Sequence, residues 1–142
     1  MKTRAGRQRG TTAVEFAICA MAMVLMMVGF TEFGRLVWTF EVLQEAASEG
    51  ARCMGLRATS CAASGAYNPA STTNYVVSLA TSRGVAITSA MVALTPAAVC
   101  GGAGGFSQVS ITYEFTTVTP QLLTPLVNGL SVPASACFPN SS

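Results

Sequence analysis

The 142-residue sequence contains no histidine and no aspartate, and only 10% of its residues carry a charge. A soluble globular domain carries about a quarter charged residues. Without histidine and aspartate the chain has no means to form a Ser-His-Asp or Cys-His catalytic group, a histidine-ligated metal site or an EF-hand loop. Glu114 is the only acid after Glu49, so the C-terminal part also lacks a pair of carboxylates for acid–base catalysis. We therefore expect a protein that is not an enzyme and that uses no metal or cofactor.

The basic residues are concentrated at the start of the chain. Four of the eight lie within the first ten residues, where there is no acid: Lys2, Arg4, Arg7 and Arg9. The rest of the chain holds four arginines against six glutamates, so the overall charge of +2 belongs to residues 1–10 and the remainder carries −2. A nucleic-acid interface requires a basic face on the folded domain, and this distribution indicates none.

An apolar stretch follows the basic start. Residues 16–30 carry no charge, and the 21 residues 11–31 contain one acid, Glu15. As a helix, 21 residues extend roughly 31 Å, about the thickness of a bilayer core. The positive-inside rule places the basic start in the cytoplasm and exports the following chain. No Ala-x-Ala-like cleavage site follows Phe30, so we expect this segment to stay in the membrane lipid as a single-pass anchor.

The helix is predicted to continue beyond the apolar stretch. No proline occurs before Pro69, so one helix from Thr11 to about Gly55 is expected. Its second half is amphipathic and therefore needs a surface to pack on. The apolar residues there recur at steps of three and four and share one face: Phe33, Val37, Phe40, Leu43, Ala47, Ala51 and Met54.

Charged and aromatic residues occupy other positions of this second half. Glu41, Glu45 and Glu49 form an acidic stripe that we expect to be solvated. Trp38 and Phe40 either mark the outer membrane interface, where aromatic residues are enriched, or belong to the buried face of the helix.

The composition changes in the C-terminal part. Residues 56–72 are rich in serine, alanine, glycine and threonine and are interpreted as a connection. A short helix is predicted over Ser71–Arg83, with Ser71 or Thr72 as its N-terminal cap and Gly84 as its stop. The residues expected on its buried face are Tyr75, Val76 and Leu79.

Three strands are predicted after this helix, namely Ala86–Leu94, Gln108–Thr117 and Leu130–Cys137. Residues 101–105 are glycine-rich and match neither a P-loop nor a dinucleotide-binding fingerprint, so we expect a flexible turn between the first two strands. The predicted fold class is α+β. A long N-terminal membrane-spanning helix precedes a small exported domain with a short helix and an antiparallel sheet of about three strands.

The cysteines fit an exported domain. Cys19 lies inside the proposed span, and the other four follow it. Four cysteines allow three pairings. We favour Cys53–Cys61, which closes a short local loop, together with Cys100–Cys137, which joins the glycine-rich hairpin to the last strand. Such bonds would help to stabilise a domain of only about 85 residues. A zinc site is the alternative, although the chain has no Cys-x-x-Cys pair.

Residues 9–16 read Arg-Gly-Thr-Thr-Ala-Val-Glu-Phe and join the basic start to the apolar helix. This segment resembles the processing site of type IV prepilins. In that family a prepilin peptidase cuts after the glycine, here Gly10, and leaves the next residue, here Thr11, as the new N-terminus. The resemblance also implies that Glu15 and the adjacent Phe16 engage neighbouring subunits. An isolated carboxylate in a bilayer is costly, and the Thr11 ammonium of a neighbour would neutralise it. The alternative is an anchor whose Glu15 only reaches the lipid headgroups.

Three blocks of the chain resemble the TadE-like family: RGTTAVEFA at residues 9–17, EFGR at 32–35 and LQEAASEGAR at 43–52. Members of that family are pseudopilins, or minor pilins, of the tight-adherence (Flp) pilus system. The resemblance implies a prepilin peptidase, other pilins or pseudopilins and the pilus assembly platform as partners. It implies neither a nucleic-acid partner nor a small-molecule substrate.

The second block supplies a stalk motif of Glu32, Gly34 and Arg35. Glu32 and Arg35 are i, i+3 neighbours, so a local surface ion pair is one interpretation. The other is a contact between packed helices, with Gly34 permitting their close approach.

The predicted organisation is a basic leader (1–10), a transmembrane and stalk helix (11–55) and an exported α+β domain (56–142). The expected location is the bacterial inner membrane, with the N-terminus in the cytoplasm and the C-terminal domain in the periplasm, or a pilus at the cell surface after assembly. The expected function is that of a minor pilin or pseudopilin. The alternatives are a periplasmic assembly factor that never enters the filament, and a signal-anchored enzyme or ligand-binding domain.

Overall fold

The computed structural model describes residues 5–117 and 129–141, and for residues 5–11 the backbone alone. The predicted α+β class is confirmed, with a long N-terminal helix, a short helix and antiparallel sheets of two and three strands. The chain divides into two units, Met1–Arg35 and Leu36–Ser142, and we call the second unit the head. Helix α1 (Ala5–Gly55) begins in the first unit and ends in the head.

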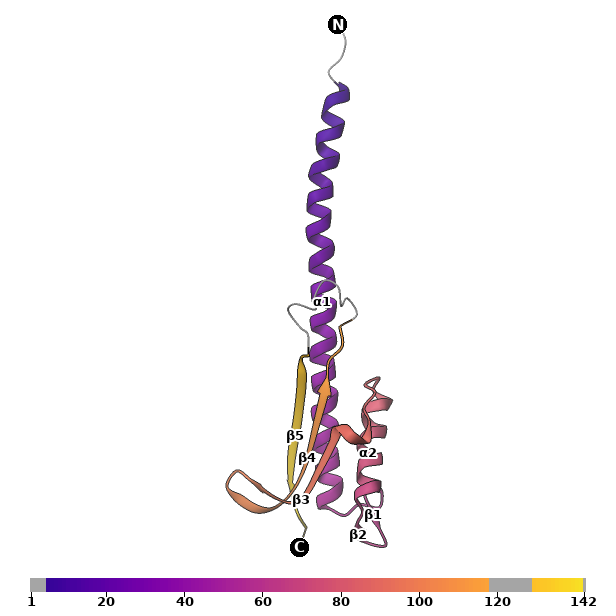
Figure 1. Ribbon diagram of the computed structural model, residues 1–142, viewed down its shortest axis with the longest axis vertical. Helices are drawn as coiled ribbons and strands as arrows, with labels where there is room; N and C mark the ends of the chain where they lie inside the picture. The colour runs from indigo at the N-terminus through magenta and orange to yellow at the C-terminus, as the bar shows by residue number, and fades with distance from the viewer. Residues whose placement is uncertain (1–4, 118–128, 142) are drawn as a thin grey trace. The chain divides into compact units, whose positions relative to one another are not determined.

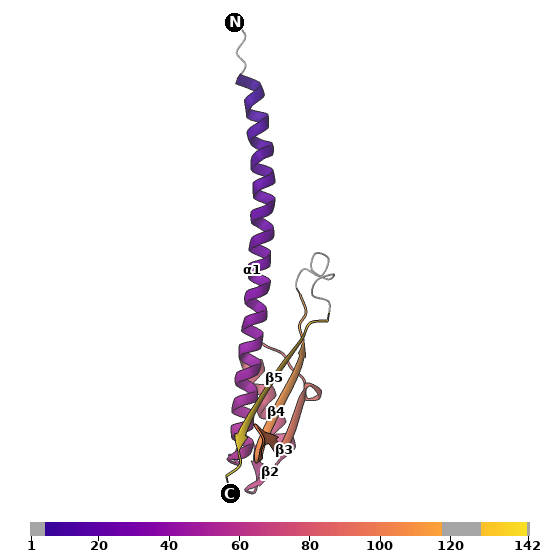
Figure 2. The same cartoon turned by 90° about the vertical axis from the view of Figure 1, so that its left-hand side faces the viewer.

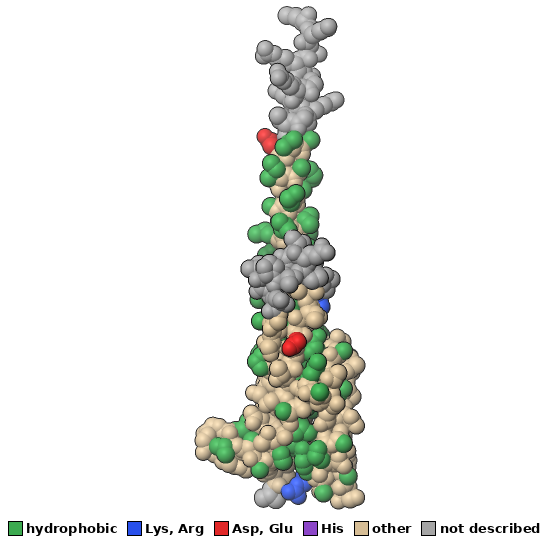
Figure 3. Space-filling view, in the orientation of Figure 1, with side chains coloured by type: hydrophobic (Ala, Val, Ile, Leu, Met, Phe, Trp, Pro, Cys, Tyr) green, Lys and Arg blue, Asp and Glu red, His purple; other side chains and the backbone are tan. Residues whose placement is uncertain are grey.

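In the first unit, α1 exposes apolar side chains at consecutive positions, so its surface is apolar around the whole circumference. Figure 3 shows such side chains along the helix. A helix that is hydrophobic all round requires an apolar environment. Among the described residues, Thr12–Gly55 is the one helix long and apolar enough to cross a membrane, as in a single-pass membrane protein. The large exposed residues are Val14, Phe16, Ile18, Met21, Met23, Val24, Leu25, Met26, Met27, Phe30 and Phe33.

The head is built on a three-stranded antiparallel sheet in the order β3–β4–β5. Its strands are β3 (Val92–Cys100), β4 (Ala103–Glu114) and β5 (Ser131–Pro139), shown in Figure 1. Buried residues alternate along β4 at Ser107, Val109 and Ile111, and along β5 at Val132 and Ala134. This period of two places one face of the sheet in the core.

The part of α1 that belongs to the head packs on this face together with the second helix, α2 (Pro69–Ser82). Figure 2 shows the strands running beside this part of α1. Of the predicted apolar face, Leu43, Ala47, Ala51 and Met54 are buried in the head, whereas Phe33, Val37 and Phe40 are exposed. The buried stretch of α1 starts at Thr39, and the partly buried Leu36 before it already packs against the core. The core residues from α1 are Val42, Leu43, Ala46, Ala47, Ala51 and Met54.

Two glycines allow this close packing. A Cβ atom on Gly50 would lie 2.5 Å from Cγ2 of Val76 in α2. One on Gly55 would lie 2.8 Å from Cδ1 of Phe138 in β5. Real Cβ atoms essentially never come within 3.0 Å of another heavy atom. Both positions therefore require glycine unless the neighbouring elements move apart.

Helix α2 begins two residues before the predicted start. Asn68 is the N-cap, and its side chain accepts a hydrogen bond of 3.1 Å from the backbone N–H of Ser71, while Pro69 occupies the first turn. The prediction of Ser71 or Thr72 as the cap is therefore wrong. Thr72 is instead buried, and its hydroxyl donates to the carbonyl oxygens of Asn68 and Cys61.

The end of α2 agrees with the prediction, because Gly84 follows the C-cap Arg83 with φ +86°. The predicted buried face is correct at Val76, whereas Tyr75 and Leu79 are only partly buried. Thr72 and Ala80 complete the buried face, at four-residue steps on either side of Val76.

The first predicted strand, Ala86–Leu94, lies too early in the sequence. Val85 and Ile87 are buried and mimic strand alternation, but the chain forms a short 3₁₀ turn at Ser89–Met91 before β3 starts. Pro96 falls inside β3, where it argues against a central strand. The strand accommodates it because β3 is an edge strand with register shifts between Thr95 and Cys100.

The hairpin of β3 and β4 turns on two glycines with positive φ. Gly101 (φ +59°) and Gly102 (φ +84°) form the whole turn, so the predicted turn over residues 101–105 is too long.

The predicted connection over residues 56–72 contains a second, small hairpin of β1 (Ala62–Ala63) and β2 (Ala66–Tyr67). Its turn residues, Ser64 (φ +53°) and Gly65 (φ +78°), also have positive φ. Burial raises the pKa of the Tyr67 hydroxyl in β2.

Two disulfide bonds and the C-terminal residues close the head. Cys53–Cys61 joins the end of α1 to the connection, and Cys100–Cys137 joins β3 to β5, the pairing favoured from the sequence. Ser141 donates hydrogen bonds of 3.0 Å from its backbone N–H and its hydroxyl to the carbonyl oxygen of Gly55. The last turn of α1 is thereby capped by the opposite end of the chain.

Candidate functional site

The predicted processing and engagement residues all lie on α1. Gly10 and Thr11 are helical in backbone. Glu15 and Phe16 are exposed, and no ion pair to Glu15 occurs within the described part of the chain. A carboxylate within an apolar span requires a cationic or hydrogen-bonding partner. No such partner for Glu15 is present among the side chains that the structure describes, which begin at Thr12.

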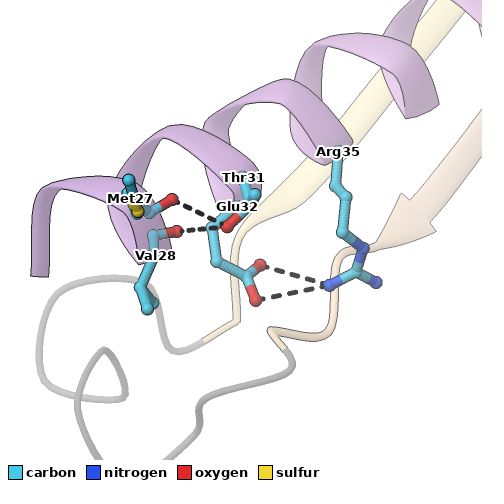
Figure 4. Close-up of polar contacts among 5 residues, drawn as sticks. All are labelled: Met27, Val28, Thr31, Glu32 and Arg35. Carbon is cyan, nitrogen blue, oxygen red and sulfur yellow. Dashed lines mark hydrogen bonds and ion pairs between the residues drawn. The ribbon is translucent and has the colours of Figure 1, made fainter. Parts of the chain in front are cut away.

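The stalk motif forms a local contact. Nη1 of Arg35 lies 3.2 Å from Oε2 and 3.4 Å from Oε1 of Glu32, one helical turn earlier (Figure 4). The i, i+3 ion pair expected from the sequence is therefore present. The Arg35 side chain is 47% exposed and the Glu32 side chain 11%. A local i, i+3 pair contributes a few tenths of a kcal/mol to helix stability. Beside it, the Thr31 hydroxyl donates hydrogen bonds to the carbonyl oxygens of Met27 and Val28.

Gly34 of the same motif has space around it. A Cβ atom added there would meet no atom within 4 Å, and the same is true of Gly29. Glycine inside a helix costs about 1 kcal/mol relative to alanine. No contact within the described residues offsets that cost, so the described structure itself does not require glycine at position 34.

The third motif block, residues 43–52, has a structural role in the head. Leu43, Ala46 and Ala47 are fully buried against the sheet and α2. The side-chain N–H of Gln44 donates a 3.0 Å hydrogen bond to the carbonyl oxygen of Ser135 in β5, and Gly50 admits Val76. The contributions of Gln44 and Gly50 were not predicted from the sequence. The feature that indicates close packing here is the run of small residues at helical spacing in this block.

The acidic stripe is more than a solvated face. Glu41 is exposed, but Glu45 forms a bidentate ion pair with Arg83, in which Nη2 lies 2.6 Å from Oε1 and Nη1 contacts Oε2. Glu49 lies 3.9 Å from Arg52, measured from Oε1 to Nη1. The side chains of Glu45 and Glu49 remain 43% and 42% exposed, so the stripe is solvated as expected, although two of its three acids are also paired within the chain.

The three glutamates of the stripe and Arg83 line a groove between α1 and the end of α2, with a volume of about 420 Å³. The indole N–H of Trp38 donates a 3.4 Å hydrogen bond to the carbonyl oxygen of Arg83, and the residue as a whole remains 58% exposed. Trp38 is therefore not a core residue. Phe40 lines a separate apolar groove of about 320 Å³ with Leu36, Val37 and Leu130.

The residue types that hold metals are scarce or already used. No group of three or more histidine, cysteine, aspartate or glutamate side chains within residues 5–117 and 129–141 could hold a metal ion. The four cysteines of the head are taken up by disulfide bonds, and Cys19 is a free, exposed residue of α1.

Residues 10–52 match the family model described as TadE-like protein, which confirms the resemblance seen in the sequence. A match to this family implies involvement in the tight-adherence (Tad) pilus. No curated protein and no solved structure shows significant similarity to the chain.

Proposed function

We propose that this chain is a minor pilin or pseudopilin that supports assembly of a tight-adherence pilus. The observation that carries the proposal is the TadE-like match over residues 10–52. That match begins at the glycine of the predicted processing site and ends in the block that packs α1 into the head. The protein acts by packing and assembly and is not an enzyme. Its partners are other pilins or pseudopilins, the assembly platform and membrane lipid.

The proposed location is the bacterial inner membrane, with the N-terminus in the cytoplasm and the head in the periplasm. Two observations support this orientation. The basic residues of the first ten positions precede the apolar span, as the positive-inside rule requires. The two disulfide bonds lie after the span and suit an oxidising compartment.

Prepilin peptidase is proposed to cut after Gly10. N-terminal sequencing of the protein from the membrane fraction should give Thr11 as the first residue when the cognate peptidase is present. Gly10→Leu should keep the Met1 start, whereas Gly6→Leu, the matched control in the leader, should still be cleaved. An intact Met1 start in the unaltered protein would refute processing at this site.

Glu15 is proposed to engage a neighbouring subunit, whose Thr11 ammonium would neutralise its carboxylate. Glu15→Ala should insert into the membrane at the normal level but reduce the number of pili. Glu114→Ala replaces an exposed carboxylate of the head and is the matched control, with normal piliation expected. Normal piliation with Glu15→Ala would remove Glu15 from the mechanism.

A membrane-anchored assembly factor that stays outside the filament remains the alternative. Immunogold labelling of sheared pili separates the two functions. Label along or at the ends of pili supports a subunit. Label confined to the cell envelope, with piliation still dependent on the protein, supports the assembly factor.

A further inference from the structure

The charged side chains of the head are few enough to account for individually. Two pairs form within the head, Glu45 with Arg83 and Glu49 with Arg52. Residues 118–128 and 142 contain no charged side chain. Three charges are therefore left without an ion pair in the described head: the acids Glu41 and Glu114 and the single cation Arg57.

The cation lies in an unusual backbone conformation just beyond the end of α1. Arg57 is exposed and has φ +50°, in the left-handed region that favours glycine. The preceding Leu56 is 47% exposed. We call Leu56 and Arg57 the tip, because together they present an apolar side chain and an unpaired cation at one end of the head's part of α1.

The groove beside α2 offers the complementary groups. Trp38 presents a largely exposed ring, which its hydrogen bond to the carbonyl oxygen of Arg83 helps to orient. Arg83 already neutralises Glu45, so Glu41 is the carboxylate of the groove that lacks a cation. An apolar ring beside an unpaired carboxylate suits a ligand with an apolar group next to a cation.

We propose that the groove of one copy of this chain receives the tip of a second copy. The Arg57 guanidinium of the second copy pairs with Glu41, and its Leu56 packs against Trp38. The proposal rests on the function proposed above, because it describes how assembled subunits touch. The observation that selects a second copy as the occupant is the charge complementarity between Arg57, the one cation without an ion pair in the described part of the head, and the groove's unpaired carboxylate.

This contact has a direction. The groove and the tip are different patches of the same chain, so the contact is heterologous and propagates from copy to copy instead of closing into a two-fold dimer. Glu41 and Gly55, the last residue of α1, are fourteen positions apart, which corresponds to roughly 21 Å along the helix axis, and Arg57 lies just beyond that end. Successive copies joined in this way would be displaced by about that distance.

Charge reversal tests the contact with the full-length chain. Two copies with different tags are expressed together in cells that carry the assembly system and are co-purified in mild detergent at low salt. If both copies carry Glu41→Arg, or both carry Arg57→Glu, recovery of the second tag should fall by about three- to tenfold, because an attractive pair becomes repulsive. Glu114→Arg, in the other unpaired acid, should leave recovery unchanged.

Mixing the two reversed copies is the decisive arm. When one copy carries Glu41→Arg and the other Arg57→Glu, both possible groove–tip contacts again join opposite charges, so recovery should return close to the unaltered level. Misfolded variants would not regain association on mixing. If neither reversal lowers recovery, or if mixing fails to restore it while each variant retains both disulfide bonds, the proposal is wrong.

The outcome is separable from that of the proposed function. Cleavage after Gly10 and the piliation defect of Glu15→Ala are measured in the same cells. Failure of both with an intact charge-reversal pattern would reject the pilin function and leave the contact standing. Their success with no charge-reversal effect would reject the contact alone.

Discussion

The two parts of α1 share an apolar character but have opposite surroundings. Between Thr12 and Arg35, large residues such as Met26 and Phe30 are about two-thirds or more exposed, and Gly34 has open space around it. Within the head, Leu43 is fully buried and Gly50 is crowded by Val76. Hydrophobic periodicity alone therefore does not say whether a helical face is satisfied within its own chain.

The polar contacts of the two parts also differ, because those of the first unit are local and that of Gln44 in the head is long-range. In the first unit the Thr31 hydroxyl bonds to carbonyl oxygens three and four positions earlier. In the head, the Gln44 side chain reaches Ser135, 91 positions away. Long-range packing and long-range hydrogen bonds both stabilise the head, so substitutions there should change folding. Substitutions in the first unit should leave the head intact.

The largest expected difference concerns a buried and an exposed side chain of α1. Leu43→Ala should lower the free energy of unfolding of the head by about 2–5 kcal/mol, because it removes a fully buried side chain and leaves a cavity. Phe33→Ala should change it by less than about 0.5 kcal/mol, since Phe33 is exposed.

Denaturant unfolding of the full-length protein in detergent, followed by fluorescence, measures both variants. Trp38 is the single tryptophan of the chain and lies in the head, so the signal reports head unfolding. Equal losses of stability for the two variants would contradict the distinction between the two parts of α1.

The second comparison uses two glycines of the same helix. Gly50→Ala should destabilise the head by about 1–3 kcal/mol, because the added Cβ would lie 2.5 Å from Val76 Cγ2 and force the helices apart. Gly34→Ala should leave head unfolding unchanged and raise helix stability by up to about 1 kcal/mol, since its Cβ meets nothing. Fluorescence reports the first effect and circular dichroism on heating the second. A stable head in Gly50→Ala would show that the α1–α2 contact adapts.

A smaller difference is expected for hydrogen bonds. Gln44→Ala removes the bond to the carbonyl oxygen of Ser135 and should cost the head about 0.5–1.5 kcal/mol. Thr31→Ala removes only local bonds to Met27 and Val28, so head unfolding should be unchanged. The same denaturation experiment compares the two variants. A larger loss of head stability for Thr31→Ala than for Gln44→Ala would contradict the assignment of the Thr31 bonds to the first unit alone.

Much of the fold could be predicted because it follows from local patterns. The uncharged run and the absence of early proline predicted α1, and the alternating residues from Gln108 located β4 approximately. A local pattern gave the wrong start for the first strand, where a short 3₁₀ turn precedes β3. The buried pair Val85 and Ile87 alternates like a strand, although the strand itself starts at Val92.

The candidate site was harder to predict because its contacts join distant positions. The crowding of Gly50 depends on Val76 and Val109, which come from another helix and from the sheet. The pairing of Glu45 with Arg83 likewise depends on where α2 ends. A sequence shows that residues 41–49 carry a glutamate every four positions, but not which of these acids finds a cation within the chain.

The smallest expected effect belongs to the stalk motif. Glu32→Gln weakens the ion pair with Arg35, and the helix should lose only a few tenths of a kcal/mol, because the pair is local and glutamine keeps the size and hydrogen-bonding groups of the Glu32 side chain, which is 11% exposed. Head unfolding and piliation should both stay at the level of the unaltered protein, with Glu15→Ala as the control that lowers piliation. Quantitative counting of pili, together with the amount of protein in the membrane fraction, measures this. A loss of pili at a normal membrane level would show that Glu32 contacts another subunit in addition to Arg35.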